Sequence, residues 1–154
     1  MIPINEHHKI WLAVLDGAQA QFYDVSLAPL KIKPHPDGHF DGNKQKSHEM
    51  GSDSPSRSFE SASTARHAAA PHVDPHEHAE ELFVTGIAHR LSQAGSEKRY
   101  DRLIIVAPPR AMAVFRKKIG KDAKALIERE ITQDWVKIPP IDIEKHLAKQ
   151  LSPS

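Results

Sequence analysis

The sequence contains no cysteine among its 154 residues. This absence excludes disulfide bonds, cysteine-based zinc sites, iron–sulfur clusters and thiol catalysis, and it is typical of a reducing compartment. Long apolar runs are also missing. The longest extends only from Ile10 to Leu15, whereas a membrane-spanning helix needs about 20 residues. The first residues show no basic segment followed by a long apolar stretch, as a secretory signal would. We therefore expect a soluble, cytoplasmic protein.

Charge is nearly balanced over the chain but uneven along it. The formal net charge is +1 at pH 7, yet residues 98–129 contain ten lysine and arginine residues against three acidic ones. This segment therefore carries +7 and the rest of the chain carries −6. Clustered cations of this kind bind phosphate groups, so the segment is a candidate nucleic-acid surface. An ordinary solvated face is the simpler explanation of the same residues.

The N-terminal part predicts a β-hairpin and a third strand. Residues 10–15 are short and apolar, as a buried strand is, Asp16-Gly17 is a turn dipeptide, and residues 19–25 resume a strand pattern. Residues 30–33 then alternate apolar and polar side chains, as a half-exposed strand does. Pro34 and Pro36 should end this third strand.

Residues 36–71 have a different composition, rich in Ser, Gly, Asp and His. Their only large apolar residues are Phe40, Met50 and Phe59. Such a segment cannot bury enough surface to offset the entropy lost on ordering. We predict a flexible loop over residues 36–71, with Phe40 and Phe59 as its candidate anchors.

The rest of the chain predicts helices that alternate with strands. Asp74, Pro75 and Glu77 form a helix-start pattern, and Gly95 should end that helix. Its predicted apolar face consists of Ala79, Leu82, Phe83, Gly86, Ile87, Leu91 and Ala94.

A buried strand is expected next over residues 102–107, followed by a helix that opens at Pro108-Pro109 and ends at Gly120. A short helix over residues 122–127 and a last helix over residues 141–151 complete the pattern. Residues 128–135 fit either a helix or an edge strand. The chain therefore predicts one α/β domain over residues 1–154, with a mixed β-sheet, an N-terminal β-hairpin and flanking helices.

Order and spacing relate four segments to one known family: Trp11–Phe22, Pro55–Phe59, His76–Phe83 and Tyr100–Arg110. Together they resemble the bacterial host attachment proteins, the proteins required for attachment to host cells. That family in turn resembles the middle domain of archaeal and eukaryotic class-one peptide release factors. The resemblance implies a ribonuclease-H-like fold and a link to translation.

In those release factors, the loop after the third strand carries Gly-Gly-Gln. This motif places a backbone amide and a water beside an ester carbonyl, and its glycines permit the close approach. The present loop has no Gly-Gly-Gln, and its most similar segment is Asp41-Gly42-Asn43-Lys44-Gln45. The side chains of Asn43 and Lys44 stand where the release factors have none. Peptidyl-tRNA hydrolysis is therefore not carried over, and no catalytic residue is assigned.

The best candidate metal ligands are four polar residues near His67: His72, Asp74, His76 and His78. Imidazole and carboxylate groups bind Zn²⁺ or Ni²⁺. Asp74 should begin a helix, however, and two helical residues two positions apart diverge by about 200°. Solvated polar residues around a helix start explain the pattern better, so no metal and no cofactor are predicted.

A hydrolase site could be assembled from Ser56, Ser58, His67 and Asp74. The sequence lacks a Gly-x-Ser-x-Gly elbow, and a mobile loop does not preorganise a catalytic triad. This site is therefore disfavoured.

The leading functional hypothesis is a non-enzymatic binding protein of the host-attachment type that contacts RNA or the ribosome. Eight cations would form the contact: Arg99, Arg102, Arg110, Arg116, Lys117, Lys118, Lys121 and Lys124. Two alternatives stay open. One is a hydrolase related to the peptidyl-tRNA-hydrolysing release factors but without Gly-Gly-Gln, and the other is an attachment factor that acts at the cell surface.

Overall fold

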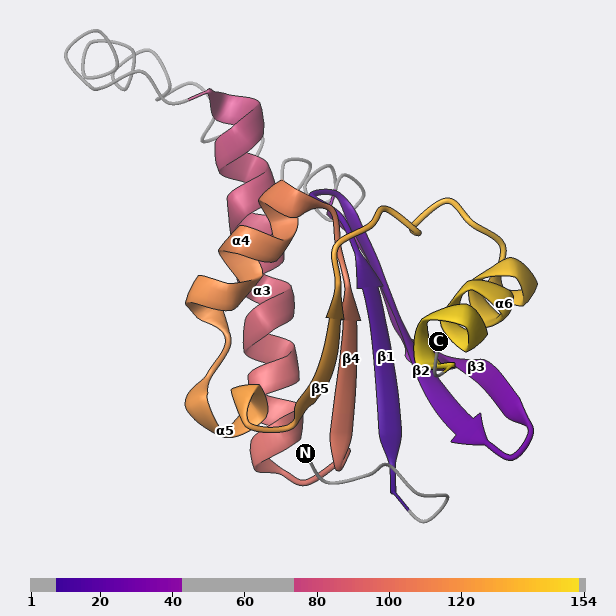
Figure 1. The fold of residues 1–154 in the computed structure, drawn as a ribbon. Coiled ribbons are helices and arrows are strands. Elements are labelled where there is room, and N and C mark those ends of the chain that lie inside the picture. Colours follow the sequence, from indigo (N-terminus) through magenta and orange to yellow (C-terminus); the bar gives the residue numbers. More distant parts are fainter. Residues whose placement is uncertain (1–7, 43–73, 153–154) are drawn as a thin grey trace, which may run out of the picture.

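The structure is a computed structural model that describes residues 8–42 and 74–152. A five-stranded sheet lies at its centre, in the strand order β3-β2-β1-β4-β5 (Figure 1). The strands are β1 (Ile10–Leu15), β2 (Gln19–Leu27), β3 (Leu30–Asp41), β4 (Arg102–Val106) and β5 (Ile127–Ile131). Strands β1, β2 and β3 are antiparallel neighbours, whereas β4 is parallel to β1 and β5 is parallel to β4. The sheet is therefore mixed, and the predicted hairpin and α/β class are confirmed.

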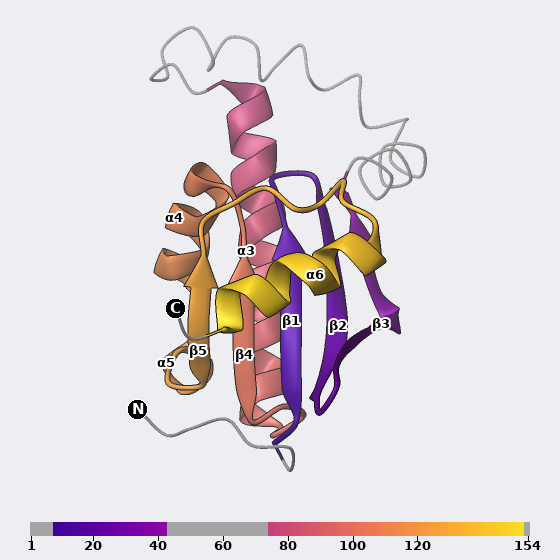
Figure 2. The same ribbon diagram turned by 45° about the vertical axis from the view of Figure 1, so that its right-hand side comes forward.

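Helices cover both faces of the sheet. Helices α3 (Pro75–Ser96), α4 (Pro109–Lys118) and α5 (Lys121–Lys124) lie on one face, and α6 (Pro140–Leu151) lies on the other. Figure 2 shows α6 in front of the sheet and α3 behind it. Within the described residues, no helix has both the length and the apolarity needed to cross a membrane.

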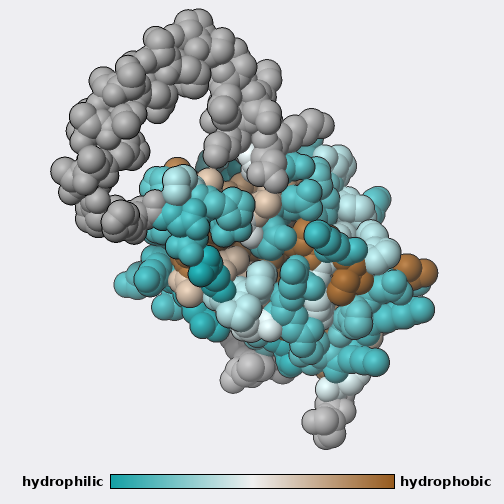
Figure 3. All heavy atoms as spheres, turned by 90° about the horizontal axis from the view of Figure 1, so that it is seen from above, coloured by the Kyte–Doolittle hydropathy of each residue, from teal (hydrophilic) through white to brown (hydrophobic). Residues whose placement is uncertain are grey.

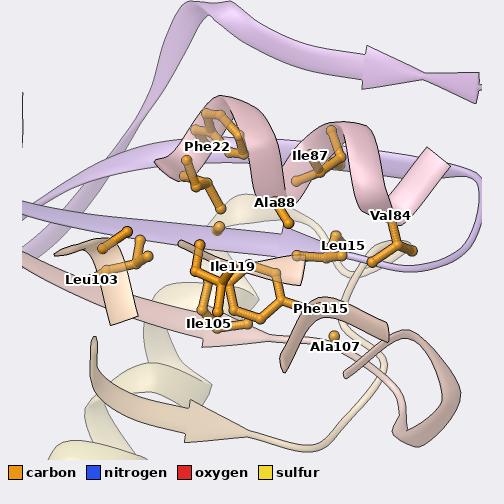
Figure 4. Packing of buried hydrophobic residues seen from close by; sticks show 14 of the residues in the cluster. Leu15, Phe22, Val84, Ile87, Ala88, Leu103, Ile105, Ala107, Phe115 and Ile119 are labelled. Atoms are coloured by element: carbon orange, nitrogen blue, oxygen red, sulfur yellow. The ribbon is translucent and has the colours of Figure 1, made fainter. Parts of the chain in front are cut away.

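Strand β1 has buried residues along its whole length because helices cover it on both sides. Since successive side chains of a strand point to opposite faces, Trp11, Ala13 and Leu15 enter the core under α3, whereas Leu12 and Val14 enter the core under α6. Figure 4 shows the α3 side, where Phe115 from α4 lies beside Ile105 of β4. The apolar run of residues 10–15 is therefore a central strand, as the sequence predicts.

Strand β3 extends through the two prolines that were expected to end it. It is an edge strand, where a residue without an N–H is tolerated. Between the pairs Gln21–His39 and Tyr23–Pro34 the register shifts, so that residues 35–38 bulge opposite Phe22. Gly38 fits this bulge because a Cβ there would lie 3.0 Å from the Cβ of Phe22.

The predicted loop therefore begins too early. Residues 36–41 belong to β3, and Phe40 is buried in the core under α3. The remainder of the predicted loop, with Phe59, falls almost wholly on residues 43–73, outside the described residues.

The start of α3 agrees with the sequence prediction, since Asp74 Oδ1 accepts a hydrogen bond of 2.9 Å from the backbone N–H of His76. Its predicted apolar face is partly wrong. Leu82 is 59% exposed and Gly86 is exposed, whereas Val84, which was left out, is buried. The buried face is rotated toward Val84 because α3 packs on the sheet with α4 beside it, and a helix pattern alone does not encode that orientation.

The structure also decides between the helix and the edge strand that were both open for residues 128–135. The predicted short helix ends early, at Lys124, because residues 127–131 form the edge strand β5. Trp135, after that strand, is 2% exposed and packs with Ile143 and Leu147 of α6. The last helix matches the prediction to within one residue.

Candidate functional site

Three of the eight predicted RNA-contacting cations are paired with carboxylates. Arg102 Nε lies 3.4 Å from Glu128 Oε1, and these side chains are only 16% and 10% exposed. Arg102 also donates a hydrogen bond to the backbone carbonyl of Asp101. Its charge is therefore neutralised within the fold, so Arg102 is a structural residue rather than a surface cation.

Two more arginines pair on the surface. Arg110 Nη1 lies 2.9 Å from Glu77 Oε1, and this ion pair joins the start of α4 to the start of α3. Arg116 contacts Glu130 of β5 through Nη2 at 2.8 Å and donates a second hydrogen bond from Nε. Both arginines are partly exposed, but each has a carboxylate in contact that competes with any phosphate.

The remaining five cations form no ion pair with another described residue. Arg99 lies with its guanidinium carbon 5.2 Å from the centroid of the Trp11 ring. The other four are exposed on α4, on α5 and at their ends, and we call them the lysine surface: Lys117, Lys118, Lys121 and Lys124.

The backbone that carries the lysine surface is held firmly against α3. The N–H of Gly120 donates to Ser92 Oγ at 2.8 Å, and that hydroxyl donates in turn to the backbone carbonyl of Ala88. Ala123 is fully buried, so it fixes α5 with Lys121 and Lys124 on its solvent side. The lysine surface is thus a defined feature of the fold, and Figure 1 shows α5, which carries Lys121 and Lys124, at the lower left.

At the other end of α4 the structure contains a pocket of about 490 Å³ that the sequence analysis did not find. It lies where β1 and β4 end, the usual place for ligands in α/β proteins. Acidic residues dominate its charged lining: Asp16, Glu77, Glu80, Glu81 and Asp134, with Arg110. Figure 3 looks down on this end of the molecule, where mostly hydrophilic residues surround smaller apolar areas. No sequence pattern pointed to the pocket because its lining comes from four distant segments.

Asp16 in this pocket has a structural role. Its Oδ1 accepts hydrogen bonds of 2.8 Å from the backbone N–H groups of both Ala18 and Gln19, which closes the β1–β2 turn. Gly17 lies so close to Glu80 that a Cβ would come within 2.8 Å of its carboxylate. The interpretation of Asp16-Gly17 as a turn is therefore confirmed.

The candidate metal ligands are not brought together. Asp74 caps α3, and His76 Nε2 lies 3.5 Å from Glu80 Oε2. Among the side chains that the structure describes, no group of three or more His, Asp or Glu is placed to hold a metal ion. His67 and His72 lie outside the described residues, as do Ser56 and Ser58 of the disfavoured hydrolase site.

Two tyrosines have perturbed acidity for structural reasons. Burial raises the pKa of Tyr100 to about 12, and its hydroxyl donates to the carbonyl of Leu91 at 2.6 Å. Burial also raises the pKa of Tyr23. Both hydroxyls therefore stay protonated at neutral pH, and neither lines the pocket.

Taken together, the mixed sheet and the two helical layers define an α/β protein, and four exposed lysines without an ion pair to another described residue form one part of its surface. The family model of the proteins required for attachment to host cells matches residues 11–147. The chain belongs to that family. No individual protein with curated annotation matches it at a significant level.

Proposed function

We propose that this member of the host-attachment family is a non-enzymatic binding protein that contacts RNA, and through RNA the ribosome. The lysine surface makes the contact. The observation that carries the proposal is that these four exposed lysines form no ion pair with described residues, whereas three of the four arginines predicted beside them do. The proposed contact therefore consists of these four lysines instead of the eight cations expected from the sequence.

The chemistry of lysine fits phosphate contacts without base recognition. Its ammonium group is a flexible point charge, and phosphate contacts supply affinity rather than sequence specificity. Helix α4 has ten residues, so its far end lies about 15 Å from its start at the acidic pocket. Carboxylates at one end and lysines at the other would orient a polyanion on the lysine surface.

The proposal includes the relation to the release-factor middle domain and its ribonuclease-H-like fold. A hairpin, a third strand, a long helix and a buried strand follow one another in the described residues, which is the order expected from the resemblance. It also treats the chain as a single, cytoplasmic domain. Hydrolysis is not part of it because the sequence lacks Gly-Gly-Gln.

A gel-shift titration with tRNA and with ribosomal RNA at low salt tests the proposal. We expect binding by the wild type, and a variant with Lys117, Lys118, Lys121 and Lys124 all changed to Glu should bind about tenfold more weakly or worse. The matched control changes four exposed lysines on β3, on α6 and before α6: Lys33, Lys137, Lys145 and Lys149. Equal losses in both variants would show that net charge alone governs binding, and no shift by the wild type would refute the proposal.

A pull-down from cell lysate distinguishes the proposal from its alternatives. Ribosomal components that disappear after nuclease treatment would support RNA binding. Recovery of surface proteins, unaffected by nuclease, would favour an attachment factor at the cell surface. Release of the peptide from peptidyl-tRNA by the purified protein would favour the hydrolase.

A further inference from the structure

Two exposed arginines lie over the ends of one row of buried aromatic rings. The guanidinium carbon of Arg90, on α3, is 4.6 Å from the centroid of Phe40, and that of Arg99 is 5.2 Å from Trp11. Phe22 connects these rings, with centroid distances of 5.1 Å to Phe40 and 5.9 Å to Trp11. The arginines therefore share one platform, which residues of β1, β2 and β3 build beneath the flank of α3.

The platform is rigid because its rings belong to the core. Trp11 and Phe22 are each 5% exposed and Phe40 is 9% exposed. Trp11 also contacts the rings of His35 and Tyr100, at 4.5 Å and 5.1 Å between centroids. A guanidinium group held over such a ring loses less freedom on binding than an unsupported side chain.

Arg90 and Arg99 also differ from the other arginines of residues 74–152 in their partners. Arg102, Arg110 and Arg116 each contact a carboxylate, and Arg129 donates to the backbone carbonyl of Gln150. Within residues 8–42 and 74–152, Arg90 and Arg99 form neither kind of bond. Their N–H groups and outer planar faces are therefore available to a ligand.

We infer that Arg90 and Arg99 form a contact for single-stranded RNA that is separate from the lysine surface. Nucleobases stack on the outer faces of the guanidinium groups, and the N–H groups bind phosphate oxygens. The inference rests on the proposed RNA binding and names the form of RNA. Paired bases inside a duplex cannot stack in this way, whereas the lysine surface binds the phosphates of either form.

The test is a double variant, Arg90→Lys with Arg99→Lys. It keeps both positive charges but removes the planar group that stacks. Affinities are measured by fluorescence anisotropy for a single-stranded oligoribonucleotide of about 12 nucleotides and for an RNA duplex of equal length. The matched control is Arg110→Lys with Arg116→Lys, which changes two arginines that carboxylates already hold. Thermal unfolding confirms that each variant is folded.

We expect the Arg90 and Arg99 variant to bind the single strand about tenfold more weakly and to bind the duplex as the wild type does. The control should change neither affinity. The inference is wrong if single-strand affinity is unchanged, or if both forms of RNA lose affinity equally. If the lysine-surface variant loses RNA binding but the arginine variant does not, the arginine contact is wrong and the proposed function stands. If the wild type binds neither RNA, the proposed function is wrong as well.

Discussion

The packing of α3 on α5 sets where half of the lysine surface lies, and two glycines of α3 test it. A Cβ at Gly95 would lie 2.8 Å from the Tyr100 hydroxyl oxygen, 3.1 Å from Ala123 Cβ and 3.3 Å from Ala123 Cα. A Cβ at Gly86 would meet nothing within 4 Å. The same Gly→Ala change should therefore have opposite effects at these two positions.

The magnitudes follow from helix propensity and overpacking. Alanine stabilises a helix interior by about 1 kcal/mol relative to glycine, so Gly86→Ala should raise the free energy of unfolding by about that amount. At Gly95 the same gain is opposed by an overpacking cost of about 2 kcal/mol. Tyr100 cannot give way because it is buried and hydrogen-bonded, and neither can the backbone at Ala123. The net result for Gly95→Ala is a loss of about 1 kcal/mol.

Urea titration and thermal unfolding, both followed by circular dichroism, measure the difference. At about 3 °C per kcal/mol for a chain of this size, the melting temperatures of the two variants should differ by about 6 °C. Tyr100→Phe should relieve part of the overpacking in Gly95→Ala, so the two changes should be non-additive. Equal stabilisation by both alanines would refute the described packing, and with it the position of Lys121 and Lys124.

Other parts of the fold give three further predictions. Leu147→Ala, at a fully buried position of α6, should lower the free energy of unfolding by about 3 kcal/mol in urea titration; a loss below about 1 kcal/mol would show that α6 is not packed on the sheet. Arg102→Gln leaves the shielded Glu128 carboxylate without its partner, so it should cost about 2 kcal/mol and leave RNA affinity unchanged, whereas weaker RNA binding at full stability would assign Arg102 to the contact. Because burial raises the pKa of Tyr100 from 10.0 to about 12, its contribution to stability is complete below pH 10 and is lost as pH rises toward 12. In urea titrations, Tyr100→Phe should make the loss of unfolding free energy above pH 10 shallower. An unchanged loss would show that Tyr100 is not the group responsible.

Elements with local signals were predictable from the sequence. The start of α3 is an example, because Asp74 and Pro75 satisfy the helix terminus through contacts within a few residues. The hairpin of β1 and β2 is another, because its turn closes on Asp16. These features depend on neighbours in the chain, so a sequence pattern contains the required information.

Features that depend on distant residues were missed. Strand β3 continues past Pro34 because a bulge restores its pairing with β2 and the ring of Phe40 is buried in the core. Neither feature is visible in the local sequence pattern. In the same way, the pairing of Arg110 with Glu77 joins residues 33 positions apart. The cations of residues 98–129 were correctly identified as a basic segment, but their division into paired and unpaired side chains required the fold.

The salt dependence of RNA affinity tests the lysine surface most directly. Each phosphate contact to a single strand contributes about 0.7 to the slope of log affinity against log salt concentration. The variant with Lys117, Lys118, Lys121 and Lys124 changed to Glu should therefore have a slope smaller by about 3 than the wild type, while the variant at Lys33, Lys137, Lys145 and Lys149 keeps the wild-type slope. Equal slopes for the wild type and the lysine-surface variant would contradict the proposed contact.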